Sequence, residues 1–188
     1  MSTTPPLEAP NTGAHRHAES LLLVNTGDGK GKTTAAMGVA LRALARGWRV
    51  LIVQFVKSGE WRAGEHDALE RLGAEWRAMG DGFSWNSDDL EASAELARDA
   101  WRAAAASIAA GEHEVVVLDE FTYPMIWGWV APDEVVAALS ERPAHVNVVV
   151  TGRDAPEMLI ELADTVTRMD NVKHAFDDGV LARRGIDF

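Results

Sequence analysis

The sequence contains no cysteine, and none of its 188 residues belongs to a long apolar run. Without cysteine there is no disulfide, thiolate nucleophile or thiolate metal site, which fits a reducing compartment. No apolar run approaches the roughly 18–20 residues of a membrane span, and the polar first twenty residues lack the apolar core of a secretory signal. We therefore expect a soluble, cytoplasmic protein that does not associate with membranes.

Basic residues are also scarce, with 18 Lys and Arg against 29 Asp and Glu, so the formal net charge is −11. Such a chain repels a polyphosphate backbone, and because no local basic stripe is visible we expect no nucleic-acid partner. The remaining composition, 47% hydrophobic and 25% charged, is ordinary for a globular protein. Residues 1–19 contain three prolines and no periodicity, which predicts a flexible arm, and residues 20–188 suit a single domain.

Short apolar runs alternate with helical patterns along the chain. The uninterrupted runs, which are typical of strands buried on both faces, are residues 21–24, 50–56, 114–118 and 146–150. Weaker strand patterns occur at residues 75–79 and 165–169. The helical patterns cover residues 33–46, 64–72, 88–110, 132–140 and 156–163, with Gly47 and Gly111 closing the first and third. This series predicts an α/β fold, a mostly parallel sheet with helices on both faces and ligands beyond the carboxyl ends of its strands.

A glycine-rich segment between the first strand and the first helix is the strongest functional signal. Gly31, Lys32 and Thr33 match the core of a phosphate-binding loop, in which backbone N–H groups and a helix N-terminus face an anion. Lys32 would supply a positive charge and the Thr33 hydroxyl a Mg²⁺ ligand. The usual first glycine, five positions before Gly31, is Thr26 here. The predicted nucleotide-binding residues are Thr26, Gly27, Asp28, Gly29, Lys30, Gly31, Lys32, Thr33 and Thr34. Together with the alternating strands and helices, this loop predicts an α/β fold of the P-loop NTPase-like (RecA-like) type.

Two carboxylates, Asp119 and Glu120, follow the apolar strand at residues 114–118. Beside a phosphate-binding loop, an acid at a strand end has the form of a Walker B segment that reaches a metal ion. The alternative is that these acids only cap a neighbouring helix. Their spacing does not decide which of the two would ligate the metal directly.

Two further patterns each allow two interpretations. Phe83 and Trp85 lie in a loop with glycines at positions 80 and 82, and they are either small core anchors or a wall against a flat ligand. Arg153, at the end of the strand at residues 146–150, either stabilises charge on a polyphosphate or forms a surface ion pair with Asp154 or Glu157. The histidines at positions 66, 113, 145 and 174 show no metal-ligand spacing, so we interpret them as structural.

Six spaced segments resemble the P-loop corrinoid adenosyltransferases, in the same order, from residue 21 to residue 188. They are residues 24–34 (VNTGDGKGKTT), 53–55 (VQF), 82–85 (GFSW), 117–123 (VLDEFTY), 150–153 (VTGR) and 172–176 (VKHAF), the last continuing to 185–188 (GIDF). The resemblance implies transfer of the 5′-deoxyadenosyl group of ATP to the cobalt of a reduced corrinoid, with triphosphate leaving. It is far more specific than a phosphate-binding loop alone, which many unrelated ATPases share.

The resemblance also implies roles for individual residues. Lys32 and Arg153 would neutralise the triphosphate, and Thr33 with Glu120 would hold Mg²⁺ (or Mn²⁺), Asp119 being the second choice. Phe83 and Trp85 would lie against the lower face of the corrin, exclude its axial ligand and ease reduction of Co(II) to Co(I).

The resemblance further implies binding partners, and it leaves rival functions to be weighed. The family binds ATP in a reversed sense across its loop, and the threonine in place of the usual first glycine, Thr26 here, is part of the family's pattern. A homodimer and a flavoprotein or reduced flavin as electron donor are also implied, whereas the longer basic arm of many members has only residues 14–18 as a counterpart. Two rivals remain at this point: a small P-loop kinase or ATPase, and a nucleotide-gated corrinoid carrier or sensor.

Overall fold

A computed structural model describes residues 12–58, 63–80 and 90–187 of the chain. The strands are β1 (Leu22–Thr26), β2 (Val50–Ser58), β3 (Glu75–Gly80), β4 (Val115–Asp119), β5 (Asn147–Thr151) and β6 (Thr165–Arg168). The helices are α1 (Lys32–Leu44), α2 (Gly64–Arg71), α3 (Leu90–Ala110), α4 (Thr122–Ile126), α5 (Pro132–Ser140) and α6 (Glu157–Leu162), with a 3₁₀ helix, η2, at Ala175–Asp178. Within these residues no helix has the length and apolar character of a membrane span.

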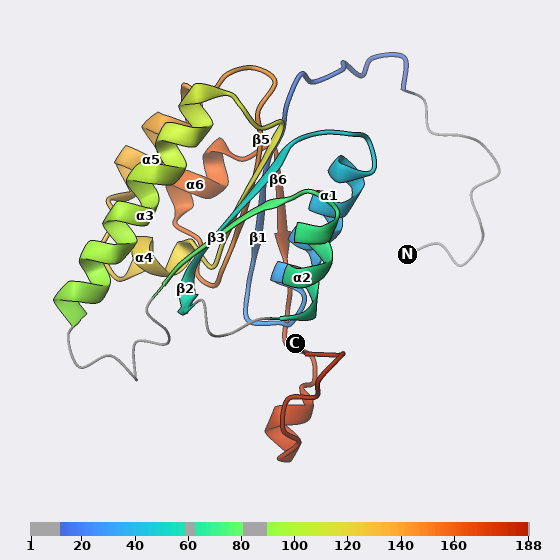
Figure 1. Ribbon diagram of the computed structural model, residues 1–188, viewed down its shortest axis with the longest axis vertical. Coiled ribbons are helices and arrows are strands. Elements are labelled where there is room, and N and C mark those ends of the chain that lie inside the picture. Colours follow the sequence, from blue (N-terminus) through green and yellow to red (C-terminus); the bar gives the residue numbers. More distant parts are fainter. Residues whose placement is uncertain (1–11, 59–62, 81–89, 188) are drawn as a thin grey trace.

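The six strands form one sheet in the order β3-β2-β4-β5-β1-β6, and every described pair is parallel. Helices α3, α4, α5 and α6 lie on one face of this sheet and α1 and α2 on the other (Figure 1). Side chains alternate between the two faces along β2: Leu51, Val53 and Phe55 join the first core cluster, while Val50 and Ile52 join the second. Because both faces are buried, the strands read as unbroken apolar runs. The predicted α/β architecture is confirmed.

The observed elements follow the sequence predictions in most places and depart from them in a few. Helix α1 ends at Leu44, and Gly47, at φ 76°, closes it as predicted. The Gly47 N–H donates to the Leu44 carbonyl oxygen at 2.9 Å and the Trp48 N–H to the Ala43 carbonyl oxygen at 3.1 Å, which is a Schellman motif. The start predicted for the third helix, Asp88, lies outside the described residues, as do Phe83 and Trp85. Two short helices, α4 and η2, were not predicted, because a single turn carries too little periodicity to be recognised.

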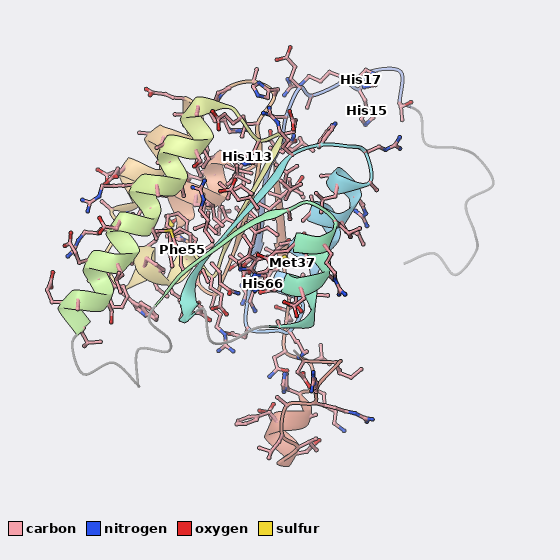
Figure 2. The ribbon with its side chains drawn as sticks, in the orientation of Figure 1. His15, His17, Met37, Phe55, His66 and His113 are labelled. Carbon is pink, nitrogen blue, oxygen red and sulfur yellow. The ribbon has the colours of Figure 1, made fainter. Side chains whose placement is uncertain are left out.

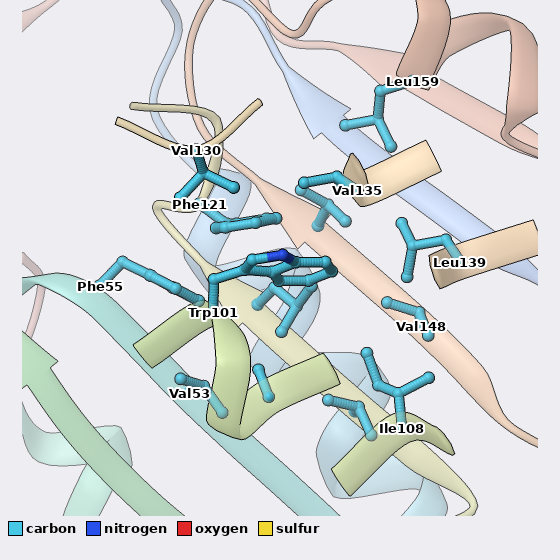
Figure 3. Packing of buried hydrophobic residues seen from close by; sticks show 14 of the residues in the cluster. Val53, Phe55, Trp101, Ile108, Phe121, Val130, Val135, Leu139, Val148 and Leu159 are labelled. Atoms are coloured by element: carbon cyan, nitrogen blue, oxygen red, sulfur yellow. The ribbon is translucent and has the colours of Figure 1, made fainter. Parts of the chain in front are cut away.

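The core beneath α3 is built around three aromatic rings (Figure 3). Trp101 of α3 is 2% exposed and stacks on Phe121 at a centroid distance of 4.9 Å, and Phe121 in turn contacts Phe55 of β2 at 4.4 Å. The Trp101 indole N–H donates to the Glu134 carboxylate at 2.8 Å. Since Phe121 directly follows Asp119 and Glu120, this cluster anchors the segment that carries the two acids.

We expect Trp101→Phe to lower the free energy of unfolding by about 1–2 kcal/mol, because it removes a partly buried hydrogen bond and part of the ring contact with Phe121. Urea denaturation followed by circular dichroism measures this loss. Glu134→Gln is the matched control, since an amide oxygen still accepts from the indole. Equal stability of Trp101→Phe and the wild type would show that the indole hydrogen bond contributes nothing to the fold.

Candidate functional site

Three polar segments meet at one edge of the sheet because they follow three adjacent strands. The loop after β1 holds the glycines, β4 ends in Asp119, and β5 ends in Thr151. In the order β4-β5-β1 these strands are neighbours, so their carboxyl ends lie side by side. This edge is where parallel α/β sheets place their ligands.

The glycine loop, residues 27–31, packs tightly against the chain that follows β6. Gly27 has φ 94°, and a Cβ there would overlap the carbonyl oxygen of Met169. A Cβ on Gly29 would lie 2.6 Å from the Asp170 carbonyl oxygen, and the Gly29 N–H donates to the Met169 carbonyl at 2.7 Å. Glycine is therefore required at both positions by close backbone approach.

Thr26, which stands where a phosphate-binding loop usually has its first glycine, makes a specific contact. Its hydroxyl oxygen accepts a hydrogen bond from the backbone N–H of Ala155 at 3.2 Å. Ala155 lies in the connection between β5 and α6, two residues after Arg153. The threonine thus ties the start of the glycine loop to the segment that carries the arginine.

Lys32 curls over the glycine loop at the first position of α1. Its ammonium group donates to the carbonyl oxygens of Gly27 at 2.7 Å and Gly29 at 2.6 Å. Burial lowers the pKa of Lys32 below its ordinary value, and the positive charge of Arg153 lowers it further. The charges of nearby acids oppose this shift. A partly buried cation beside the glycine loop is well placed to interact with an anion that enters the site.

Asp119 is fully buried and joins three elements. Its Oδ1 accepts from the hydroxyls of Thr33, at 2.8 Å, and Thr151, at 2.7 Å, and its Oδ2 accepts from the Gln54 amide at 3.0 Å. No side chain caps α1 or α4, the helices that begin on either side of this carboxylate. The interpretation of Asp119 as a helix cap was therefore wrong: it holds the Thr33 hydroxyl in place.

Glu120 takes a different position from its neighbour. Its backbone has φ 61°, a strained conformation for a non-glycine residue, and its N–H donates to the Thr151 hydroxyl oxygen at 2.9 Å. The residue lines a cavity of about 220 Å³ together with Lys32, Thr33 and Arg153. The two acids thus have separate places, Asp119 beneath the Thr33 hydroxyl and Glu120 in the cavity wall.

Arg153 projects from the end of β5 toward the glycine loop. One of its terminal guanidinium nitrogens lies 3.8 Å from an Asp28 carboxylate oxygen, so the prediction of an ion pair with Asp154 or Glu157 was wrong. Its carbonyl oxygen accepts from the Thr122 hydroxyl at 2.6 Å. The hydrogen bond holds the Arg153 backbone in place, and the guanidinium group lies beside the glycine loop at the cavity.

A family model described as ATP:corrinoid adenosyltransferase BtuR/CobO/CobP matches residues 18–188. The chain belongs to this family. Corrinoid adenosyltransferase of Escherichia coli (strain K12) is 44% identical over 168 residues, which cover 89% of this chain and 85% of the relative. Corrinoid adenosyltransferase CobA of Salmonella typhimurium is 43% identical over the same shares, and corrinoid adenosyltransferase of Pseudomonas aeruginosa is 42% identical over 92% and 86%.

Membership of this family confirms the resemblance, the enzyme class and the substrates, ATP and a corrinoid, that the sequence indicates. The roles assigned to individual residues stay predictions. The structure brings Lys32, Thr33, Asp119, Glu120 and Arg153 to one sheet edge. The aromatic loop with Phe83 and Trp85 lies outside the described residues.

A metal ion at this edge would need ligands from its substrate. Within the described ranges no three His, Asp or Glu side chains lie close enough to form a metal site of their own. His66 and His113, both labelled in Figure 2, contact adjacent residues of β3: His66 stacks on Trp76 at 4.3 Å and His113 contacts Glu75 at 3.2 Å. These contacts support structural roles for both. Mg²⁺ usually takes one or two protein oxygens and completes its coordination shell with substrate phosphates and water. The side chains at this edge can provide the one or two protein oxygens.

The sequence analysis missed several residues that shape this edge. Gln54 and Thr151 hold Asp119; both lie in segments that carry the family resemblance, 53–55 and 150–153, but neither was given a role. Ile186 and Asp187 return to line the cavity, where Asp187 forms an ion pair with Lys30. Tyr123 also lines it, and burial raises the pKa of its phenol, as does the charge of Glu120 to a smaller degree.

Proposed function

We propose that the enzyme transfers the 5′-deoxyadenosyl group of ATP to the cobalt of a Co(I) corrinoid, in adenosylcobalamin biosynthesis or corrinoid salvage. The cobalt donates an electron pair to C5′, the C5′–O5′ bond breaks, and triphosphate leaves with the bonding electrons. The observation that carries this proposal is the meeting of Lys32, Arg153 and the Asp119-held Thr33 around one cavity, in a chain of this family.

The residues at the cavity suit a reaction of this kind. Because the corrinoid itself is the nucleophile, the site needs no general base and no protein nucleophile. Its tasks are to hold C5′ in line with the cobalt and to neutralise the leaving triphosphate. Lys32, Arg153 and the N–H groups at the start of α1 provide that positive potential, with residues 26–34 forming the P-loop.

We propose Thr33 and Glu120 as the protein ligands of Mg²⁺, with Mn²⁺ as an alternative. All three hydrogen bonds at the Asp119 carboxylate come from Thr33, Thr151 and Gln54, which supports a role for Asp119 in orienting the Thr33 hydroxyl rather than in direct ligation. Thr33 and Glu120 line the same cavity as Lys32. When bound, the ion would neutralise charge on the triphosphate oxygens.

The remaining proposals rest on the family resemblance. We propose a cytoplasmic homodimer that receives its electron from a flavoprotein or reduced flavin, with residues 1–19 as an arm outside a single domain. Phe83 and Trp85 would face the lower side of the corrin, where they exclude its axial ligand.

Phe83→Ala or Trp85→Ala is expected to reduce turnover about ten-fold when the enzyme is supplied with Co(II) corrinoid and a reductant, because an apolar wall is lost. With chemically prepared Co(I) the loss should be much smaller. Parallel assays with the two cobalt states measure the difference. Equal losses in both would contradict a role in assisting reduction.

The function itself is tested by anaerobic incubation with ATP, Mg²⁺ and chemically reduced cobalamin. A light-sensitive Co–C product and an equal amount of triphosphate are expected. A small kinase or ATPase would instead release phosphate without corrinoid, and a carrier or sensor would bind both ligands yet release no triphosphate. Turnover of cobalamin, cobinamide and earlier diamide intermediates would identify the acceptor.

A further inference from the structure

The cations of the candidate phosphate site already have internal acceptors. Lys30 is paired with the Asp187 carboxylate, and the Arg153 guanidinium group lies 3.8 Å from Asp28. Lys32 donates to two carbonyl oxygens of the glycine loop instead. An entering triphosphate group must therefore exchange with two carboxylates, rather than meet free cations.

The partner of Lys30 comes from the far end of the chain. After β6 the chain leaves the sheet beside the glycine loop, at Met169, and Ile186 and Asp187 return to the same edge, where they line the cavity. Asp187 also accepts from the Arg183 backbone N–H at 2.7 Å, which fixes its carboxylate toward Lys30. The Lys30 hydrogen bond lowers the pKa of Asp187, so this carboxylate is charged at neutral pH.

Both ion pairs are placed where they can open. The side chains are 47% and 22% exposed in the Lys30–Asp187 pair and 52% and 64% exposed in the Arg153–Asp28 pair. Exposed pairs of this kind contribute little to stability, so their function is not to hold the fold together. A carboxylate in or beside the glycine loop, such as Asp28 or Asp187, repels the triphosphate that the loop is proposed to bind. The presence of these two carboxylates therefore needs another explanation.

We propose that Asp28 and Asp187 are positioning residues for product release, which take back Arg153 and Lys30 as triphosphate leaves. Triphosphate leaves with the bonding electrons of C5′–O5′, so it carries one negative charge more than the triphosphate group of ATP. Two carboxylates beside the cations therefore weaken the product's binding more than the substrate's. This inference rests on the proposed function, because triphosphate is the product only of that reaction.

The test is calorimetric titration of the full-length protein with inorganic triphosphate and Mg²⁺. Asp28→Asn and Asp187→Asn should each bind triphosphate about two- to five-fold more tightly than the wild type, and the double variant by about the product of the two factors. Asp187→Glu should restore wild-type affinity, and high salt should reduce the differences. In steady state the Asn variants should show stronger product inhibition by triphosphate, with a smaller change in KM for ATP.

Asp178→Asn is the matched control, because it breaks an exposed ion pair with Lys173, at 3.6 Å, on the same C-terminal segment without touching the glycine loop. Its affinity for triphosphate should equal that of the wild type. Unchanged or weaker binding by both Asn variants, in a wild type that binds triphosphate, would overturn this inference and leave the proposed function standing. A wild type that forms no triphosphate from ATP and Co(I) corrinoid would overturn both.

Discussion

Lys32→Ala is expected to lower kcat/KM for adenosyl transfer by about 10²–10³-fold, with ATP and chemically reduced cobalamin as substrates. The loss should be the same with any reductant, because Lys32 acts on the triphosphate and not on the reduction of cobalt. Its ammonium group lies over the glycine loop, bonded to the Gly27 and Gly29 carbonyl oxygens, where the phosphates are proposed to bind. Lys30, the other lysine of the loop, is paired with the Asp187 carboxylate, whereas the hydrogen bonds described for the Lys32 ammonium group go to carbonyl oxygens. Alanine at position 32 therefore removes a cation that no carboxylate neutralises by a described hydrogen bond.

The lysine prediction has a matched control. Lys173→Ala removes an exposed ammonium group, 83% accessible, whose partner is Asp178. It changes the net charge by the same amount but should leave activity unaffected. A pH series adds a second measurement: since the pKa of Lys32 is lowered, wild-type activity should fall as the pH rises through that lowered value and Lys32 loses its charge. Full activity of Lys32→Ala would contradict the proposed site.

Much of the fold follows from the sequence because both faces of the sheet are buried. Consecutive residues such as Val50 and Leu51 are both apolar, and they lie on opposite faces of the sheet. Such an unbroken apolar run is typical of a strand that helices cover on both faces. The glycine loop could also be predicted from the sequence, since its chemistry depends on residues that are neighbours in the chain. The order of the strands could not be predicted, because no local pattern indicates which strand lies beside which.

The partners of Asp119 show why the rest of the site could not be predicted. Thr33 precedes it by 86 residues, Gln54 by 65, and Thr151 follows it by 32. These groups meet because β2 and β5 flank β4 with Gln54 opposite Asp119, and because β5 also lies beside β1. Register sets such contacts, so a sequence gives the type of residue at a strand end and not its partners. The ion pair between Asp187 and Lys30 could not be predicted for the same reason.

The site also depends on a glycine that no motif singled out as structural. Gly152 has φ 144°, and a Cβ there would overlap the Thr122 hydroxyl oxygen and lie 2.9 Å from the Thr122 Cβ. That hydroxyl donates to the Arg153 carbonyl oxygen at 2.6 Å. A side chain at position 152 must therefore displace α4, the end of β5, or both.

Gly152→Ala is expected to lower the free energy of unfolding by about 3–5 kcal/mol, because backbone strain and an overlap with Thr122 act together. Activity of the folded fraction should fall as well, since the Arg153 backbone moves. Gly128→Ala is the matched control: Gly128 also has positive φ, at 72°, but a Cβ there meets no atom within 4 Å, so only the strain of about 1–2 kcal/mol is expected.

A double-mutant cycle separates the two contributions. Thr122→Ala in the Gly152→Ala background removes the overlapping hydroxyl and should recover part of the lost stability, although Thr122→Ala alone is destabilising because it removes the bond to the Arg153 carbonyl. Urea denaturation of the four proteins gives the coupling energy. If Gly152→Ala were no more destabilising than Gly128→Ala, the contact between α4 and the end of β5 would be loose enough to yield, and Arg153 would not be fixed by it.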